Sequence, residues 1–187
     1  IILYINITNS LFMQYLDEDF VLKKININTI ESPRESLELC SPTKSSLPIS
    51  GGWGHSLDEC VIINKNDPSV HPETFNGLEI EYAFVEQRIY AELISGRPLE
   101  ERFRDIKWTQ KEQNLLTENG RAFDNLHYSI SCLNVKDWDY LNKIFLENNE
   151  FNDNPKGLEK YLKDKEDLTY CFDTYYWFDI TSFFYSN

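Results

Sequence analysis

One short segment of the sequence brings together residue types that could do chemistry. Residues 49–60 read ISGGWGHSLDEC: three glycines surround a tryptophan, and His55, Asp58 and Cys60 follow. A histidine near a cysteine is the pairing that catalysis by a thiolate requires, and a carboxylate can assist the histidine. A small enzyme with His55 as acid–base, assisted by Asp58 or Cys60, is therefore one function that this segment suggests.

The same segment lacks the spacing of the established catalytic and phosphate-binding motifs. It has no Lys-Ser/Thr pair as in a P-loop, no GxGxxG and no GxSxG. The acidic neighbours Asp58 and Glu59 disfavour a thiolate at Cys60, which also opens an apolar run where cysteine is usually a small buried hydrophobe. We interpret the segment as a turn held by Trp53, and we expect recognition there before catalysis.

Histidines and cysteines elsewhere do not suggest a metal or a redox centre. Zinc ligands usually stand at helical or hairpin spacing, such as CxxC, and no such spacing occurs in the sequence. We predict no metal site and no cofactor, and we interpret the cysteines as buried free thiols in a reducing compartment. The residues concerned are scattered along the chain: His55, His71, His127, Cys40, Cys60, Cys132 and Cys171.

The charge balance of the chain restricts its partners. The 31 acidic and 18 basic residues give a net charge of −13. This field repels phosphate backbones, so we expect no nucleic acid and no anionic membrane as a partner. A basic protein is the partner that the charge favours.

Acidic and aromatic side chains gather at positions where a sheet could present them. On the expected strand 170–180, Cys171, Asp173, Tyr175, Trp177 and Asp179 share one face, and the other face is typical of a core. Rigid aromatics beside carboxylates are typical of interfaces that receive Lys or Arg. Residues 78–84 (LEIEYAF) alternate as a strand, with the glutamates towards water. The predicted partner-binding residues are Asp173, Tyr175, Trp177, Asp179, Glu79, Glu81 and Trp53.

The elements that must position these residues follow from periodicity and turn chemistry. Asn119-Gly120 predicts a hairpin, and Asn134 and Asn154-Pro155 predict helix starts. We expect strands at 1–7, 19–30, 60–64, 78–84, 122–133 and 170–180, a long loop at 32–59 with a helical turn at 34–39, and helices near 85–94, 135–147 and 155–165.

The order of these elements indicates the fold class. Strands dominate the first part and helices come late, without a βαβ alternation. We predict an α+β fold: a single domain over residues 1–187, with a largely antiparallel sheet and two or three helices packed on one face. No apolar run has transmembrane length and the first residues are not typical of a signal peptide, so we expect a cytoplasmic protein.

Charge, scarce histidine and missing catalytic motifs together favour a binding function. We expect a non-catalytic acidic protein that recognises a basic partner, in the manner of an immunity or inhibitor protein that neutralises a toxin or nuclease domain. Two alternatives stay open: the small enzyme built on residues 49–60, and an accessory subunit of a larger assembly.

Overall fold

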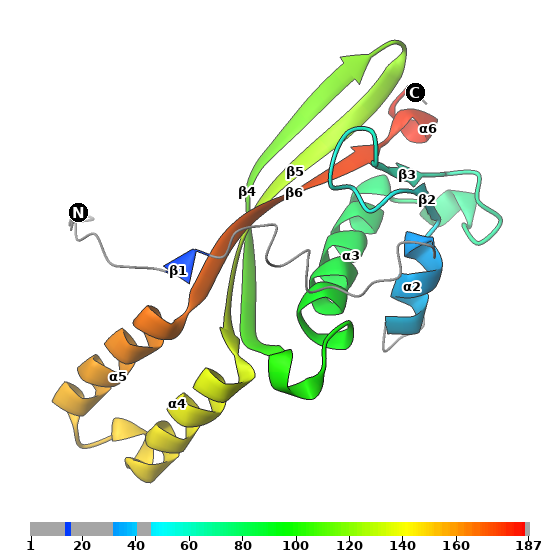
Figure 1. Cartoon of the computed structure of the whole chain (residues 1–187). Coiled ribbons are helices and arrows are strands. Elements are labelled where there is room, and N and C mark those ends of the chain that lie inside the picture. Colours follow the sequence, from blue (N-terminus) through cyan, green and yellow to red (C-terminus); the bar gives the residue numbers. More distant parts are fainter. Residues whose placement is uncertain (1–13, 16–31, 41–45, 186–187) are drawn as a thin grey trace, which may run out of the picture.

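The computed structural model describes residues 14–15, 32–40 and 46–185. The strands expected at 1–7 and 19–30 lie outside these residues. Within them the α+β class is confirmed: one mostly antiparallel sheet has the strand order β2-β3-β6-β5-β4, and β1 pairs with β6 (Figure 1). The strands are β1 (Gln14–Tyr15), β2 (Ile49–Gly51), β3 (Val61–Ile63), β4 (Phe103–Glu118), β5 (Arg121–Asn134) and β6 (Tyr170–Asp179).

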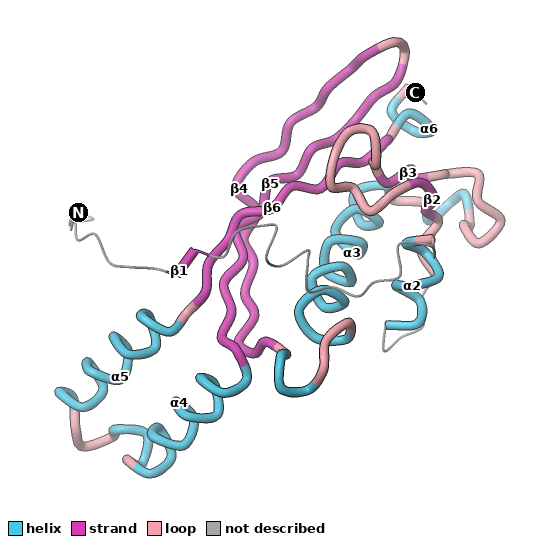
Figure 2. Tube along the Cα trace, in the orientation of Figure 1, coloured by secondary structure: helices cyan, strands magenta, loops and turns pink. Residues whose placement is uncertain are grey.

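A long hairpin of β4 and β5 forms one side of the sheet. Its turn is the predicted Asn-Gly pair, with φ of 52° at Asn119 and 77° at Gly120, as a type I′ turn requires. β6 pairs antiparallel with β5, and β3 pairs parallel with the last part of β6. β4 is the outermost strand on its side of the sheet (Figure 2).

The predicted core face of β6 is confirmed, and β5 alternates in the same way. One face of the two strands is buried, and it supplies the centre of the hydrophobic core together with α3. The core residues from these strands are Ala122, Leu126, Tyr128, Ile130, Cys132, Phe172, Tyr176 and Phe178. Because strand side chains alternate, the other face carries His127, Ser129, Asp173 and Tyr175.

Residues 78–84 are not the predicted strand but the first half of a helix, α3 (Gly77–Tyr90). The side chain of Asn76 caps this helix by accepting a hydrogen bond from the backbone N–H of Glu79. The spacing of Phe84, Val85 and Ile89 buries one side of the helix. The alternation of apolar residues favours a strand, but the Asn76 cap and the contacts of the buried side with the core stabilise a helix.

Two helices cover the core face of the sheet: α3 and α2 (Pro33–Cys40), which forms where the sequence suggested a helical turn (Figure 1). The structure also places a strand, β2, inside the segment predicted as a loop. The remaining short helical elements are α6 (Thr181–Phe184), η1 (Pro72–Thr74), η2 (Ala91–Ser95), η3 (Leu99–Glu101) and, in the helical hairpin described next, η4 (Asn149–Phe151).

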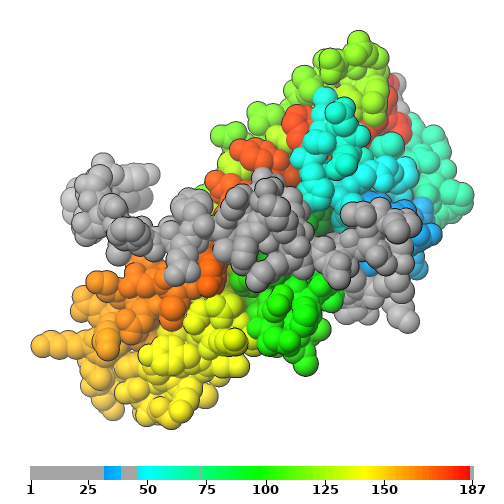
Figure 3. All heavy atoms as spheres, viewed as in Figure 1, coloured from blue at the N-terminus to red at the C-terminus, as the bar shows by residue number. Residues whose placement is uncertain are grey.

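The two late helices form a hairpin that extends beyond one end of the sheet: α4 (Val135–Glu147) and α5 (Pro155–Leu168) (Figure 3). Their predicted caps are confirmed, since Asn134 accepts from the N–H of Asp137 and Asn154 from that of Gly157. Leu162 is 54% exposed, so it does not form the contact between the two helices. Phe151 and Tyr161 pack at the centre of this hairpin instead.

Candidate functional site

The glycine loop, residues 49–60, is folded tightly against the end of β6. Gly54 has a φ of +76°, and a Cβ there would lie 3.1 Å from the backbone oxygen of Trp177. The backbone oxygen of Gly54 accepts a hydrogen bond from Trp177 N at 2.9 Å. Glycine is therefore required here for close backbone packing rather than for cradling a ligand.

A buried arginine fixes the loop to α3. Arg88 is 0% exposed, and its guanidinium donates to the Trp53 carbonyl, to His55 Nδ1 and to Glu92 Oε1, each at 2.6 Å. It also lies over the Tyr176 ring, 4.6 Å from the ring centroid. We call these five residues (Trp53, His55, Arg88, Glu92, Tyr176) the Arg88 cluster. Its charges are satisfied within the chain.

His55 is held in this cluster as a neutral imidazole. Burial, reinforced by the Arg88 charge, lowers its pKa to about 3. An imidazole with this pKa stays deprotonated near neutral pH, and its Nδ1 is already occupied as an acceptor. These features suit a structural role better than acid–base catalysis, which works best with a pKa near the operating pH.

Asp58 and Cys60 lie on another side of the loop. With Arg121 and Glu118 at the tip of the β4–β5 hairpin, they line a pocket of about 380 Å³. Burial and the nearby Asp179 carboxylate raise the pKa of the Cys60 thiol, against the opposing effect of Arg121. The thiol is thus protonated near neutral pH, and the contacts of His55 are made with Arg88 and not with Cys60.

The predicted partner-binding residues of β6 divide into exposed and internal groups. Asp173 and Tyr175 are exposed; the Tyr175 ring stacks on His127 at 4.5 Å, and Asp173 Oδ2 lies 3.7 Å from His127 Nε2. Trp177 is half-buried. Asp179 is buried and pairs with Arg121 Nη2 at 2.6 Å, so its carboxylate is used inside the chain.

A groove on the core side of the sheet is the feature best suited to bind a partner. It lies between α3 and the β4–β5 hairpin and has a volume of about 540 Å³. Acidic and aromatic side chains dominate its walls. We call it the acidic groove, and it is lined by Glu79, Tyr82, Ala83 and Glu86 of α3, Trp108 and Gln110 of β4, and Tyr128 of β5.

The two glutamates of the acidic groove have no counter-ion among the described residues. Glu79 and Glu86 are exposed, and neither forms a salt bridge within the described part of the chain. They stand seven residues apart on α3, which separates them by about 10 Å along the helix axis. The groove therefore presents two unpaired negative charges along one wall.

Aromatic rings lie between and below these charges. Tyr82 is 40% exposed and Tyr90, at the end of α3, is 38% exposed. The Tyr90 ring meets Trp108 edge to face at 5.7 Å, and the Tyr128 hydroxyl donates to Gln110 Oε1 at 3.3 Å. Exposed ring faces beside carboxylates suit the binding of an ammonium or guanidinium group.

Glu81 is a buried carboxyl behind the acidic groove. The prediction that it shares a solvent face with Glu79 is wrong, because positions two apart on a helix point in different directions and Glu81 is 2% exposed. Burial and the nearby Asp124 raise its pKa to about 8. Its Oε2 has no hydrogen-bond partner among the described residues, so α3 carries a carboxyl that is protonated near neutral pH.

Most residues of the acidic groove were not predicted. Only Glu79 was among the expected binding residues; Tyr82, Glu86, Trp108, Gln110 and Tyr128 were not. Positions 79, 82, 83 and 86 share one side of a helix, and this helical spacing was the available signal. Treating the segment as a strand concealed it.

Comparisons with protein-family models, with curated proteins and with solved structures find no match to this chain. In the described ranges, no group of three or more His, Cys, Asp or Glu residues is placed to hold a metal ion. None of the helices described is both long enough and apolar enough to span a bilayer.

Proposed function

We propose that this protein is a non-catalytic binding protein whose acidic groove receives Lys or Arg side chains of a basic protein partner. One observation carries the proposal: Glu79 and Glu86 stand unpaired beside the exposed ring of Tyr82 and the Trp108 ring in one groove of the described chain. A cation in this groove is attracted by the two carboxylates and also contacts the faces of the aromatic rings.

The net charge of −13 supports the same partner class at longer range. A strongly negative protein attracts a positive one before contact, which raises the association rate at low salt. An immunity or inhibitor protein that covers a basic toxin or nuclease domain would use these properties. A subunit that docks on a basic neighbour in an assembly would use the same groove.

The acidic groove is a stronger candidate than the exposed face of β6. On that face Asp173 already lies near His127, and Tyr175 is stacked on the same imidazole ring. Trp177 is half-buried. The groove offers two carboxylates without a counter-ion in the described residues, whereas the β6 face offers one, with a histidine beside it.

Titration with labelled heptalysine tests the proposal while the natural partner is unidentified. We expect salt-sensitive binding to the wild-type protein, and a loss of about tenfold in affinity for Glu79→Gln/Glu86→Gln, since two ion pairs of up to about 1 kcal/mol are removed. Binding should weaken from low ionic strength to about 0.15 M, where charges are screened beyond about 8 Å.

A charge-matched control separates the groove from the overall field. Glu159 and Glu166 of α5 are exposed and have the same seven-residue spacing on a helix. Glu159→Gln/Glu166→Gln changes the net charge equally and should alter the affinity less than about twofold. Equal losses in the two double variants would show diffuse attraction and would contradict a specific groove.

A further inference from the structure

The acidic groove opens beside an unpaired strand edge. Trp108 and Gln110, which form its floor, belong to β4, and β4 is the last strand in the sheet order. One side of its backbone therefore has no neighbouring strand in the described part of the chain. Such an edge presents free N–H and C=O groups to any extended segment that lies beside it.

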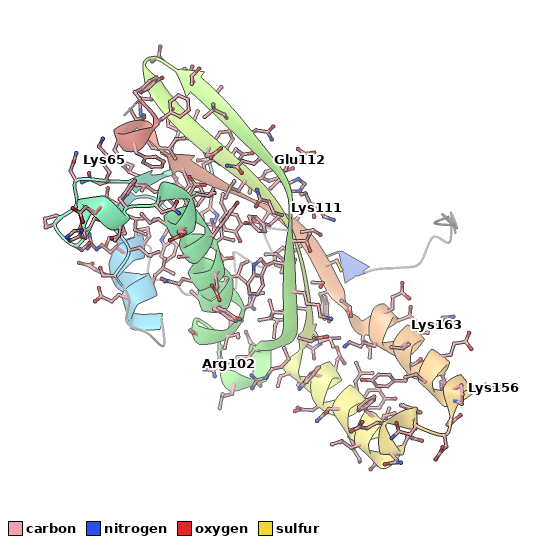
Figure 4. The ribbon with its side chains drawn as sticks, turned by 180° about the vertical axis from the view of Figure 1, so that it is seen from behind. Lys65, Arg102, Lys111, Glu112, Lys156 and Lys163 are labelled. Atoms are coloured by element: carbon pink, nitrogen blue, oxygen red, sulfur yellow. The ribbon has the colours of Figure 1, made fainter. Side chains whose placement is uncertain are left out.

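One of two long in-register stretches of this edge coincides with the groove, and the other runs from Glu112 to Glu118. The pairing of β4 with β5 is in register from Lys107 to Gln110, and it is interrupted before and after this stretch. Figure 4 shows Lys111 and Glu112 where β4 bends, next to the second interruption. The interruptions limit how far an added strand can pair beside the groove, and the groove lining distinguishes this stretch from the one that follows it.

Side-chain alternation fixes what an added strand would present. On β4, Trp108 and Gln110 face the groove, while Lys107 and Thr109 face the opposite side of the sheet. A strand beside β4 would also direct every second side chain towards the groove, about 7 Å apart. The groove carboxylates are spaced by about 10 Å, which long lysine or arginine side chains at these positions can reach.

From this juxtaposition we infer that the basic partner docks as an extended strand along Lys107–Gln110 of β4, with Lys or Arg at alternate positions entering the acidic groove. The inference rests on the proposed function, and it adds the backbone geometry of the bound segment. A second copy of this chain is a poorer occupant, because it would bring a further net charge of −13 to a groove that already lacks counter-ions among the described residues.

Peptides of equal composition and different order provide the test. One short peptide alternates lysine and valine, and its isomer carries the same residues in two blocks. We expect the alternating peptide to bind about tenfold more tightly, and Glu79→Gln/Glu86→Gln to remove most of the difference. Glu159→Gln/Glu166→Gln should preserve it.

Backbone methylation of the peptide tests the strand contact directly. In an extended peptide the N–H groups of the lysines point to one side and those of the valines to the other. N-methylation of one set should reduce affinity at least about tenfold, while methylation of the other set changes it less than about threefold. Equal effects of both methylations, or equal affinity of alternating and block peptides, would overturn the inference.

The outcomes distinguish this inference from the proposed function. In one outcome, heptalysine binds at the groove while residue order and methylation of the peptides have no effect. This result would refute the docking of an extended strand on β4 and would support the acidic groove as a cation-binding site. Absence of heptalysine binding would refute both. Sedimentation that shows a concentration-dependent dimer, dissociated by the alternating peptide, would identify a second copy as the occupant and would overturn the inference.

Discussion

The Arg88 cluster and the acidic groove lie on different sides of α3 and use charge in opposite ways. Arg88 is fully buried, and the described chain supplies its carboxylate, its carbonyl and its imidazole acceptor. Glu79 and Glu86 are exposed and have no cation beside them among the described residues. A charge that is satisfied internally stabilises the fold, whereas a charge left unpaired in a groove is available to a partner.

The difference also explains why the glycine loop resembles an active site without the required chemistry. Its histidine is a hydrogen-bond acceptor for Arg88, and its tryptophan contributes a backbone carbonyl to the same guanidinium. Glycines let the loop fold closely on itself and against β6. Trp53 and His55 thus hold the glycine loop in place. Substitutions in the Arg88 cluster should therefore change stability, whereas substitutions in the acidic groove should change binding.

The largest expected effect belongs to the centre of the Arg88 cluster. Arg88→Met leaves the Glu92 carboxylate buried without its ion pair and removes the donors to Trp53 and His55. We expect a loss of about 3–5 kcal/mol in the free energy of unfolding, measured by urea denaturation. Arg104→Met, at an exposed position of β4, should cost less than about 0.5 kcal/mol. A loss below about 1 kcal/mol for Arg88→Met would remove the distinction between the two regions.

Glu81 should give the next effect, as a change in the pH dependence of stability. Its pKa is raised from 4.5 to about 8 on folding, so the folded state holds a proton that the unfolded state releases. Stability should therefore fall as pH rises from about 4.5 to about 8, by an amount on the order of a few kcal/mol.

Glu81→Gln removes this titration. The variant should become more stable relative to the wild type as pH rises through that window, as measured by thermal unfolding at several pH values. Glu79→Gln, two residues away and exposed, should keep the wild-type slope. Parallel curves for Glu81→Gln and the wild type would show that Glu81 is not buried as described.

His55→Ala should have a smaller effect, which decides between structure and catalysis. It removes the acceptor of the Arg88 Nη2 hydrogen bond, and we expect a loss of about 2 kcal/mol near neutral pH. Since the pKa of His55 is lowered to about 3, the wild type itself loses stability as pH falls below about 6.5. The difference from the variant should therefore shrink in acid.

The exposed His71 supplies the control, and His71→Ala should behave as the wild type. A His55→Ala protein with an unchanged melting temperature would contradict the structural role, and the enzyme built on residues 49–60 would then become the better account.

The smallest expected effect lies in the groove itself. Tyr82→Ala removes an exposed ring face and should weaken heptalysine binding by about two- to fivefold, the range for a cation–π contact at an exposed site. Stability should change by less than about 1 kcal/mol. Tyr140→Ala, at an exposed ring on α4, should leave the affinity unchanged. Similar losses of heptalysine affinity in both variants would show that an exposed ring contributes equally outside the groove, which would contradict a specific role of Tyr82.

The parts of the fold that local chemistry determines were predictable. Asn119-Gly120 specifies its own turn, Asn134 and Asn154 cap their helices, and period two along β6 identifies its core face. The first half of α3 was not predictable in this way, because apolar residues at 78, 80, 82 and 84 have the period of a strand and not that of a helix. Contact of this segment with the sheet determines that it forms a helix.

The candidate site was harder to predict because it depends on the register in which β4 and β5 pair. Trp108 and Tyr128 stand on two strands of one hairpin, and the register that brings them under α3 includes an irregularity between Gln110 and Glu112. Periodicity does not reveal such an irregularity. The burial of Glu81 was missed for a related reason, since it follows from the helix that the alternation concealed.

The decisive experiment is a map of where heptalysine binds, from backbone amide chemical shifts during a titration. If the acidic groove is the binding site, the largest shifts will occur at residues 79–86 of α3 and 107–110 of β4, with small shifts at Trp53, His55 and Arg88. Largest shifts at Asp173 and Tyr175, in the glycine loop, or spread evenly over the acidic surface would contradict the groove as the binding site.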